Sequence, residues 1–151
     1  MLPLAPCRTA YTSFRLPLGK ALAVKRQMEL INRYKEKYSG TYAGPASPSE
    51  VDSLLSELGI SDQVYREWLV ATGGGPIGSE WFDEVQELLP SQEKCASEKW
   101  SISGAVIGWD GAGNPIAIQE NGKILVEDHN FGGVHVFAES FEAYLGKCVN
   151  S

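Results

Sequence analysis

The spacing of hydrophobic residues changes along this chain, from helical in its front part to alternating in its back part. Over residues 19–40, apolar side chains recur at steps of three and four, with Lys, Arg and Glu between them. This spacing predicts a basic amphipathic helix. Residues 1–18 contain three prolines and no sustained period, so we expect an irregular arm there. The apolar positions of the helix are Ala21, Val24, Met28, Ile31, Tyr34 and Tyr38.

Capping residues predict two further helices. Ser47 can cap a helix, and Glu50 three residues later completes a capping box. A single apolar stripe follows, and Gly59 then supplies the stop. A shorter helix begins at Ser61 or Asp62 and ends before a run of three glycines.

The segment between these glycines and residue 100 fits two interpretations. The Trp-Phe pair at 81–82 suits a short strand, whereas the apolar residues within 85–89 suit a helical turn. Pro90 and Ser91 predict a break after them, and residues 92–100 are expected to form another short helix.

From residue 101 onward the hydrophobic period falls to two, which is typical of strands. Glycine-rich turns separate the apolar runs, and Asn121-Gly122 is a strong signal for a two-residue hairpin. Helices first and an antiparallel meander afterwards predict an α+β fold. Strands are expected at residues 105–109, 115–120, 123–127 and 134–137, followed by a helix capped by Ser140.

Charge is distributed unevenly along the 151 residues, a length that suits one domain. Residues 1–40 carry eight basic and two acidic residues, a net charge of +6. Residues 41–151 carry five basic and 17 acidic residues, a net charge of −12. We expect residues 41–151 to form the domain, with the basic helix as an added element. A domain with this much negative charge repels the phosphate backbones of nucleic acids, so we do not expect nucleic acid as a ligand. The same charge attracts basic proteins.

The three cysteines, Cys7, Cys95 and Cys148, lack the paired spacing of a secreted disulfide framework or of a zinc site. No run approaches the roughly 18 apolar residues that a membrane-spanning helix needs. We therefore expect a cytoplasmic protein that does not enter a membrane. Nothing in the sequence sets the oligomeric state, and a monomer is the default expectation.

Asp128, His129 and His135 form the segment that most suggests chemistry. They could bind a metal ion, or act as an acid–base group in a small hydrolase. A metal site needs several converging ligands, however, and the chain contains no other His. An Asp-His-Asn sequence in a loop also satisfies its own turn by local hydrogen bonds. We expect no catalytic residue, no bound metal and no cofactor, and therefore no enzyme.

Acidic residues are the remaining functional feature. Residues 80–98 carry a net charge of −5, and a Trp and a Phe lie among these carboxylates. One interpretation is a solvated acidic face, and the other is a patch that docks a basic protein. The candidate partner-binding residues are Glu80, Trp81, Asp83, Glu84, Glu87, Glu120, Glu127 and Asp128.

The order of these motifs resembles that of the SUKH superfamily. The capped helix at 47–59, and the segment Val64-Tyr65-Arg66-Glu67-Trp68-Leu69 that runs into the glycines, resemble the front half of that family. Residues 107–118 are similar to its central hairpin, and residues 137–145 to its closing strand-to-helix motif. The resemblance covers about residues 45–146.

The resemblance implies a twisted, mostly antiparallel sheet flanked by helices, and it implies a binding role. Many bacterial members are immunity proteins that neutralise toxins, often nucleases, and fungal relatives are scaffolding regulators of cell-wall synthesis. We therefore expect a protein that neutralises a basic, nuclease-type toxin domain, with a housekeeping scaffold of the same fold as the alternative. The chain departs from the family at Ser61-Asp62, where a Pro is common, and at Thr72, where an Asn is common.

Overall fold

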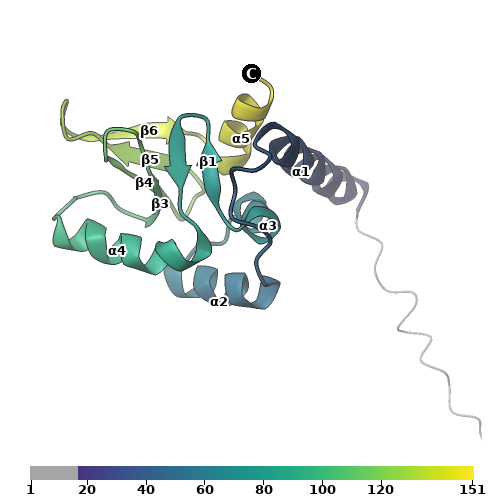
Figure 1. Cartoon of the computed structure of the whole chain (residues 1–151), viewed down its shortest axis with the longest axis horizontal. Coiled ribbons are helices and arrows are strands. Elements are labelled where there is room, and N and C mark those ends of the chain that lie inside the picture. Colours follow the sequence, from purple (N-terminus) through teal and green to yellow (C-terminus); the bar gives the residue numbers. More distant parts are fainter. Residues whose placement is uncertain (1–16) are drawn as a thin grey trace, which may run out of the picture.

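The computed structural model describes residues 17–151, so the arm expected at 1–18 lies almost entirely outside the described residues. Figure 1 shows how the helices and strands are arranged. The helices are α1 (Leu18–Lys37), α2 (Pro48–Leu58), α3 (Gln63–Thr72), α4 (Leu88–Ser97) and α5 (Phe141–Val149), with a 3₁₀ turn, η2 (Val85–Glu87), before α4. The strands are β1 (Gly75–Ile77), β2 (Glu80–Phe82), β3 (Ala105–Trp109), β4 (Pro115–Ile118), β5 (Ile124–Glu127) and β6 (Val134–Ala138).

The six strands form one antiparallel sheet whose order follows the chain, β1-β2-β3-β4-β5-β6. The predicted α+β fold with a C-terminal meander is therefore confirmed. The strands expected after residue 101, and the helix that Ser140 caps, lie where the alternation and the turn signals place them. The β1–β2 hairpin adds two short strands to this meander.

Helices cover the sheet on both faces. Ile107, Ile116 and Ile124 belong to the main core, together with apolar side chains of α1, α2, α3 and α5. Val106 and Ala117 form a second, smaller core with Cys95 of α4. Figure 1 shows α4 running next to β3.

Both predicted caps are present. The backbone N–H of Glu50 donates to Oγ of Ser47 at 3.4 Å, and Gly59 ends α2 with a φ of +73°. The backbone N–H of Tyr65 donates to Oδ1 of Asp62 at 2.9 Å, so Asp62 is the residue that caps α3. These caps satisfy backbone donors that the first turn of a helix leaves unpaired.

The predicted basic helix is α1, but its apolar positions behave differently along its length. Tyr34 is fully buried in the main core, and its hydroxyl donates to the carbonyl of Pro76 at 2.7 Å. Val24 and Met28, two of the apolar positions of the predicted helix, are 45% and 56% exposed. The reason is that the first half of α1 extends away from the rest of the molecule (Figure 1).

The second half of α1 packs against α5. The guanidinium of Arg33 donates to Oδ1 of Asn150 at 2.9 Å. The ammonium of Lys37 donates to the carbonyls of Cys148 and Ser151. Cations at this position suit the unpaired carbonyls at the end of α5. The helix expected as an addition to the domain therefore shares the core of that domain.

The predicted break at Pro90 and Ser91 is wrong. Both residues lie inside α4, which begins at Leu88 rather than at residue 92. Pro90 occupies the first turn of the helix, where a backbone N–H has no partner within the helix, so its missing donor costs nothing there.

The glycine run after α3 does more than stop the helix. Gly73 ends α3 with a φ of +72°. At Gly74, where φ is +106°, a Cβ atom would lie 2.4 Å from the carbonyl oxygen of Asp83. The run is therefore packed directly against the backbone that follows β2.

Candidate functional site

The candidate partner-binding residues lie at both ends of the strands. Trp81 of β2 is the register partner of Trp109 of β3, and Glu127 of β5 is that of Val134 of β6. Because neighbouring strands run in opposite directions, the start of β2 and the ends of β3 and β5 share one end of the sheet. Glu120 follows β4 and lies at the opposite end. The eight residues therefore do not form a single patch.

Four of them lie close together in the sequence, from the start of β2 to the 3₁₀ turn that follows it. Trp81 is 40% exposed, and its Nε1 donates to Oε1 of Glu87 at 3.2 Å. The same carboxylate oxygen accepts from the backbone N–H of Glu84 at 2.8 Å. Glu80 directly precedes Trp81 on β2 and accepts from the hydroxyl of Ser79 at 2.9 Å. We call Glu80, Trp81, Glu84 and Glu87 the Trp81 cluster.

Asp83 differs from its acidic neighbours because its side chain is buried, with 2% exposure. The hydroxyl of Ser91 donates to its Oδ2. Burial raises the pKa of Asp83 to about 7, against the lowering effects of the Ser91 hydrogen bond and of Lys94. Asp83 thus lies beneath the acidic surface rather than on it.

Glu127 and Asp128 hold neighbouring backbone. Oε1 of Glu127 accepts from the backbone N–H groups of Ser101 and Ile102 at 2.8 and 2.7 Å, which fixes the segment between α4 and β3. Oδ1 of Asp128 accepts from the N–H groups of the two residues that follow His129. These bonds lower the pKa of Asp128. A role for either carboxylate in partner binding stays a prediction.

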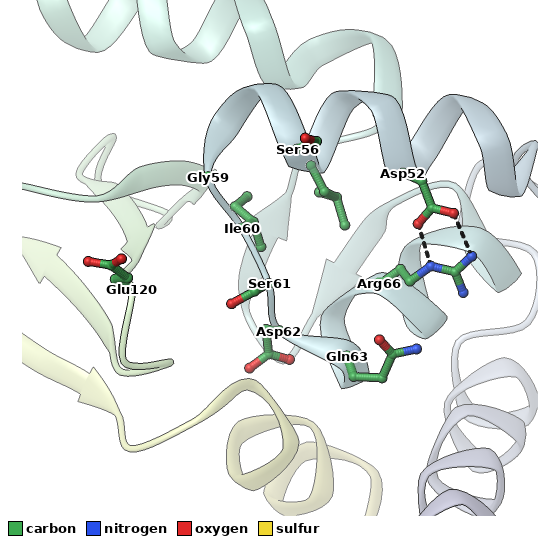
Figure 2. Close-up of a pocket in the computed structure, with 10 residues that line it drawn as sticks. Asp52, Ser56, Gly59, Ile60, Ser61, Asp62, Gln63, Arg66 and Glu120 are labelled. Carbon is green, nitrogen blue, oxygen red and sulfur yellow. Dashed lines mark hydrogen bonds and ion pairs between the residues drawn. The ribbon is translucent and has the colours of Figure 1, made fainter.

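Glu120 borders a cavity of about 500 Å³ at the other end of the sheet. Figure 2 shows Glu120 on the turn after β4, across from the loop between α2 and α3 that carries Asp62. Asp52 and Arg66 line the far side of the same cavity. Three carboxylates against one guanidinium make this concave surface acidic as well.

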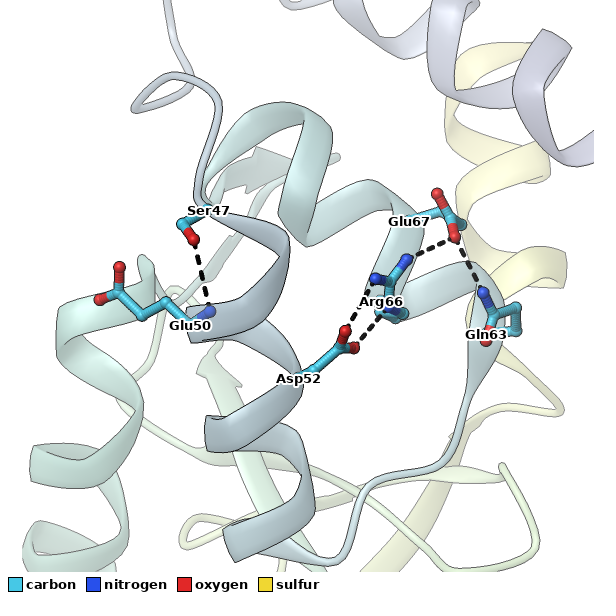
Figure 3. Close-up of polar contacts among 6 residues, drawn as sticks. All are labelled: Ser47, Glu50, Asp52, Gln63, Arg66 and Glu67. Atoms are coloured by element: carbon cyan, nitrogen blue, oxygen red, sulfur yellow. Dashed lines mark hydrogen bonds and ion pairs between the residues drawn. The ribbon is translucent and has the colours of Figure 1, made fainter.

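Arg66 is committed to a network between α2 and α3 (Figure 3). Its Nε and Nη2 donate to the two carboxylate oxygens of Asp52 at 2.6 and 2.9 Å, and its Nη1 donates to Glu67 at 2.7 Å. The Arg66 hydrogen bond lowers the pKa of Asp52. This network was not predicted from the sequence. The available signal was that Arg66 is the only basic residue between residues 38 and 93.

The His residues are not arranged around a common centre. Nδ1 of His129 hydrogen-bonds Oδ1 of Asn114, and its ring lies 6.1 Å from that of Trp100. His135 lies exposed on β6. Within residues 17–151, no three His, Cys, Asp or Glu side chains are grouped so that they could hold a metal ion.

Cys95 is buried and Cys148 is half-buried, and the two do not form a disulfide with each other. Cys7 lies outside the described residues. No helix in the described part of the chain is both long and apolar enough to cross a membrane.

Comparison with known proteins gives one family. The family model described as SMI1 / KNR4 family (SUKH-1) matches residues 45–147. This range begins just before α2 and ends within α5, so it includes the whole sheet and the Trp81 cluster and leaves out α1. No individual curated protein matches the chain. The resemblance to the SUKH superfamily is thus confirmed, and the chain belongs to the SMI1 / KNR4 family (SUKH-1).

Proposed function

We propose that this protein binds a bacterial toxin domain and neutralises it by direct contact, without catalysing a reaction. The observation that carries the proposal is the family match, because SUKH membership supports a protein-interaction role in toxin immunity or in regulation. The net charge of −12 over residues 41–151 then favours a basic partner. A nuclease-type toxin fits, since proteins that bind phosphate backbones carry clustered Lys and Arg.

The Trp81 cluster is the proposed contact surface. Exposed Trp side chains are typical anchors of protein interfaces. Trp81 is one, and the Glu87 carboxylate accepts its indole N–H, with Glu80 and Glu84 close to it in the sequence. Carboxylates around an anchor steer a basic partner toward it and raise the association rate. The cavity beside Glu120 is acidic too, but its lining offers no exposed aromatic side chain among the described residues.

A binding role also agrees with how the candidate catalytic side chains are used. Asp128 and His129 each hydrogen-bond within their own loop or to the neighbouring Asn114. A general base must reach a proton of the substrate. A side chain whose acceptor atoms already bind the backbone of its own turn is poorly placed to do so.

Affinity capture tests the proposal. The tagged full chain is expressed in its own cells and purified at low and at high salt, and the captured proteins are identified by mass spectrometry. Recovery of one basic toxin domain at near-equal stoichiometry, together with loss of toxicity when the two are co-expressed, is the expected result. Stable complexes formed only with ordinary cellular proteins would contradict toxin neutralisation.

A regulatory scaffold of the same fold is the second candidate, and one observation favours it. The helix α1 exposes three large apolar side chains, Leu18, Leu22 and Met28, which are 76%, 57% and 56% exposed. This helix lies outside the family match, so its exposed apolar residues offer a separate docking surface. A scaffold partner should be lost when Leu22 and Met28 are replaced by Ser, whereas a toxin bound at the Trp81 cluster should remain.

A further inference from the structure

A second aromatic side chain lies next to the Trp81 cluster and forms a cavity with it. The cavity has a volume of about 410 Å³ and lies between the β2–β3 pair and α4. Trp81 and Trp109 are register partners on adjacent antiparallel strands, so their indoles project from the same face of the sheet. The polar side chains that line the cavity are Asp83, Gln86, Glu87, Ser91 and Lys94.

Hydrogen bonds hold both indoles by their edges. Nε1 of Trp81 donates to Glu87 at 3.2 Å, and Nε1 of Trp109 donates to Oγ of Ser91 at 3.0 Å. The hydroxyl of Ser91 in turn donates a hydrogen bond to Asp83, so each indole N–H is connected to a carboxyl group, directly for Trp81 and through Ser91 for Trp109. Both rings are therefore fixed in direction before any partner arrives.

A cation of this chain already occupies part of the cavity. Nζ of Lys94 lies 4.2 Å from the centroid of the Trp109 ring, which is a cation–π contact. Lys94 is exposed, and it forms no ion pair with any residue that the structure describes. An exposed contact of this kind is weak, so a better cation can replace it.

We propose that this cavity receives one arginine side chain of the partner, which displaces Lys94 from Trp109. The guanidinium stacks on the indoles of Trp81 and Trp109, and its N–H groups donate to the Glu87 carboxylate. Arginine is favoured over lysine because its planar group stacks on aromatic rings, forms forked hydrogen bonds with carboxylates and loses water more easily. The inference rests on the proposed function in that the partner is a basic protein.

Indole NMR signals of the full chain provide the test. The ¹⁵N-labelled protein, which contains four Trp, is titrated with N-acetyl-arginine methylamide and, at matched ionic strength, with N-acetyl-citrulline methylamide. Citrulline has the same shape without the charge. Saturable shifts of the Trp81 and Trp109 signals with the arginine compound alone are expected. Equal shifts with both compounds, or no saturable shift with arginine, would overturn the proposal.

Matched variants separate the roles of the side chains. Lys94→Gln should tighten arginine binding by about two- to fivefold, because the competing cation is gone. Glu87→Gln should weaken it by about threefold, since the hydrogen-bonding shape stays and the charge is lost. Glu98→Gln is the control, because Glu98 accepts from Nε1 of Trp100 at 2.9 Å in the same way but outside the cavity. An unchanged affinity in Lys94→Gln would overturn the displacement.

The outcome is distinguishable from failure of the proposed function. If the protein binds the arginine compound saturably but captures no toxin, the cavity assignment stands and the proposal of toxin binding is rejected. Conversely, if a captured toxin binds wild type, Glu87→Gln and Trp109→Phe with the same affinity, the cavity assignment is rejected and the proposal of toxin binding stands. Trp100→Phe is the aromatic control for that comparison.

Discussion

The hydroxyl of Ser91 on α4 donates a hydrogen bond to the Asp83 carboxyl, which lies just after β2. Asp83 is buried, and burial raises its pKa from 3.8 to about 7, with the charge of Glu87 acting in the same direction and that of Lys94 against it. Between these two values the folded protein keeps the proton that the unfolded chain has lost. The unfolded state therefore binds fewer protons than the native state in this range.

We predict that the free energy of unfolding decreases as the pH rises from about 4 to about 7, by up to about 4 kcal/mol from Asp83 alone. The stabilisation from protonated Asp83 is complete below the pKa that Asp83 has in the unfolded chain. It is lost as the pH rises to the pKa that Asp83 has in the folded protein. In Asp83→Asn this slope disappears. Urea denaturation across the range measures it, with the exposed Glu120→Gln as the control. Parallel profiles for wild type and Asp83→Asn would contradict the assignment.

Gly74 allows a second prediction. A Cβ atom there would lie 2.4 Å from the Asp83 carbonyl oxygen, at a φ of +106°. Gly74→Ala should therefore destabilise the fold by roughly 3 kcal/mol or more. Gly113→Ala is the matched control, because φ is +84° and no atom lies within 4 Å of its Cβ position, so only about 1 kcal/mol of backbone strain remains. Equal melting temperatures for the two variants would speak against close packing at Gly74.

Glu127 should be important for stability, whatever its role in binding. It accepts two backbone N–H groups and the Ser101 hydroxyl. Glu127→Ala should lower the free energy of unfolding by about 2 kcal/mol, since hydrogen bonds to a charged acceptor are lost together. Glu120→Ala, at an exposed position, should change it by less than about 0.5 kcal/mol. Denaturant midpoints of the two variants check this difference.

Association kinetics test the Trp81 cluster once a partner is captured. Replacing Glu80, Glu84 and Glu87 by Lys should slow association about tenfold or more and should flatten its dependence on salt. The control carries the same change of charge at three exposed glutamates elsewhere, which are Glu36, Glu57 and Glu139. Stopped-flow or surface-binding experiments measure the association rates of the two triple variants. Equal slowing in both would show that the overall charge of the protein, and not this surface, governs the encounter.

Local signals in the sequence were sufficient for most of the fold. Caps such as Ser47 and Asp62 and the hairpin at Asn121-Gly122 depend on neighbouring residues, so they can be recognised without knowing the tertiary structure. Pro90 misled the prediction because the start of α4 depends on packing against the sheet, and Pro is tolerated only within the first turn.

The candidate site was predictable in composition but not in arrangement. The acidic segment around Trp81 could be seen in the sequence, whereas the burial of Asp83 could not. All five residues at 80–84 are acidic or aromatic, so the segment has no alternation of polar and apolar positions that would mark one carboxylate as buried. The Trp81–Trp109 pair depends on strand register between segments that are 28 residues apart. The two strands are joined through α4 and not by a hairpin turn, so no turn signal between them predicts which residues are opposite each other.

The packing of α1 on α5 has a consequence for the order in which the molecule can form. Arg33 and Asn150 are separated by 117 residues, and Lys37 and Cys148 by 111. A ribosome makes α1 long before α5, so Leu30, Ile31 and Tyr34 have no complete surface to pack against during most of synthesis. Closing such distant contacts is slow, because the entropy of the long intervening loop is lost before the contacts compensate for it. Of the five helices in the described part of the chain, α1 is synthesised first, and we expect it to be among the last to reach its final position.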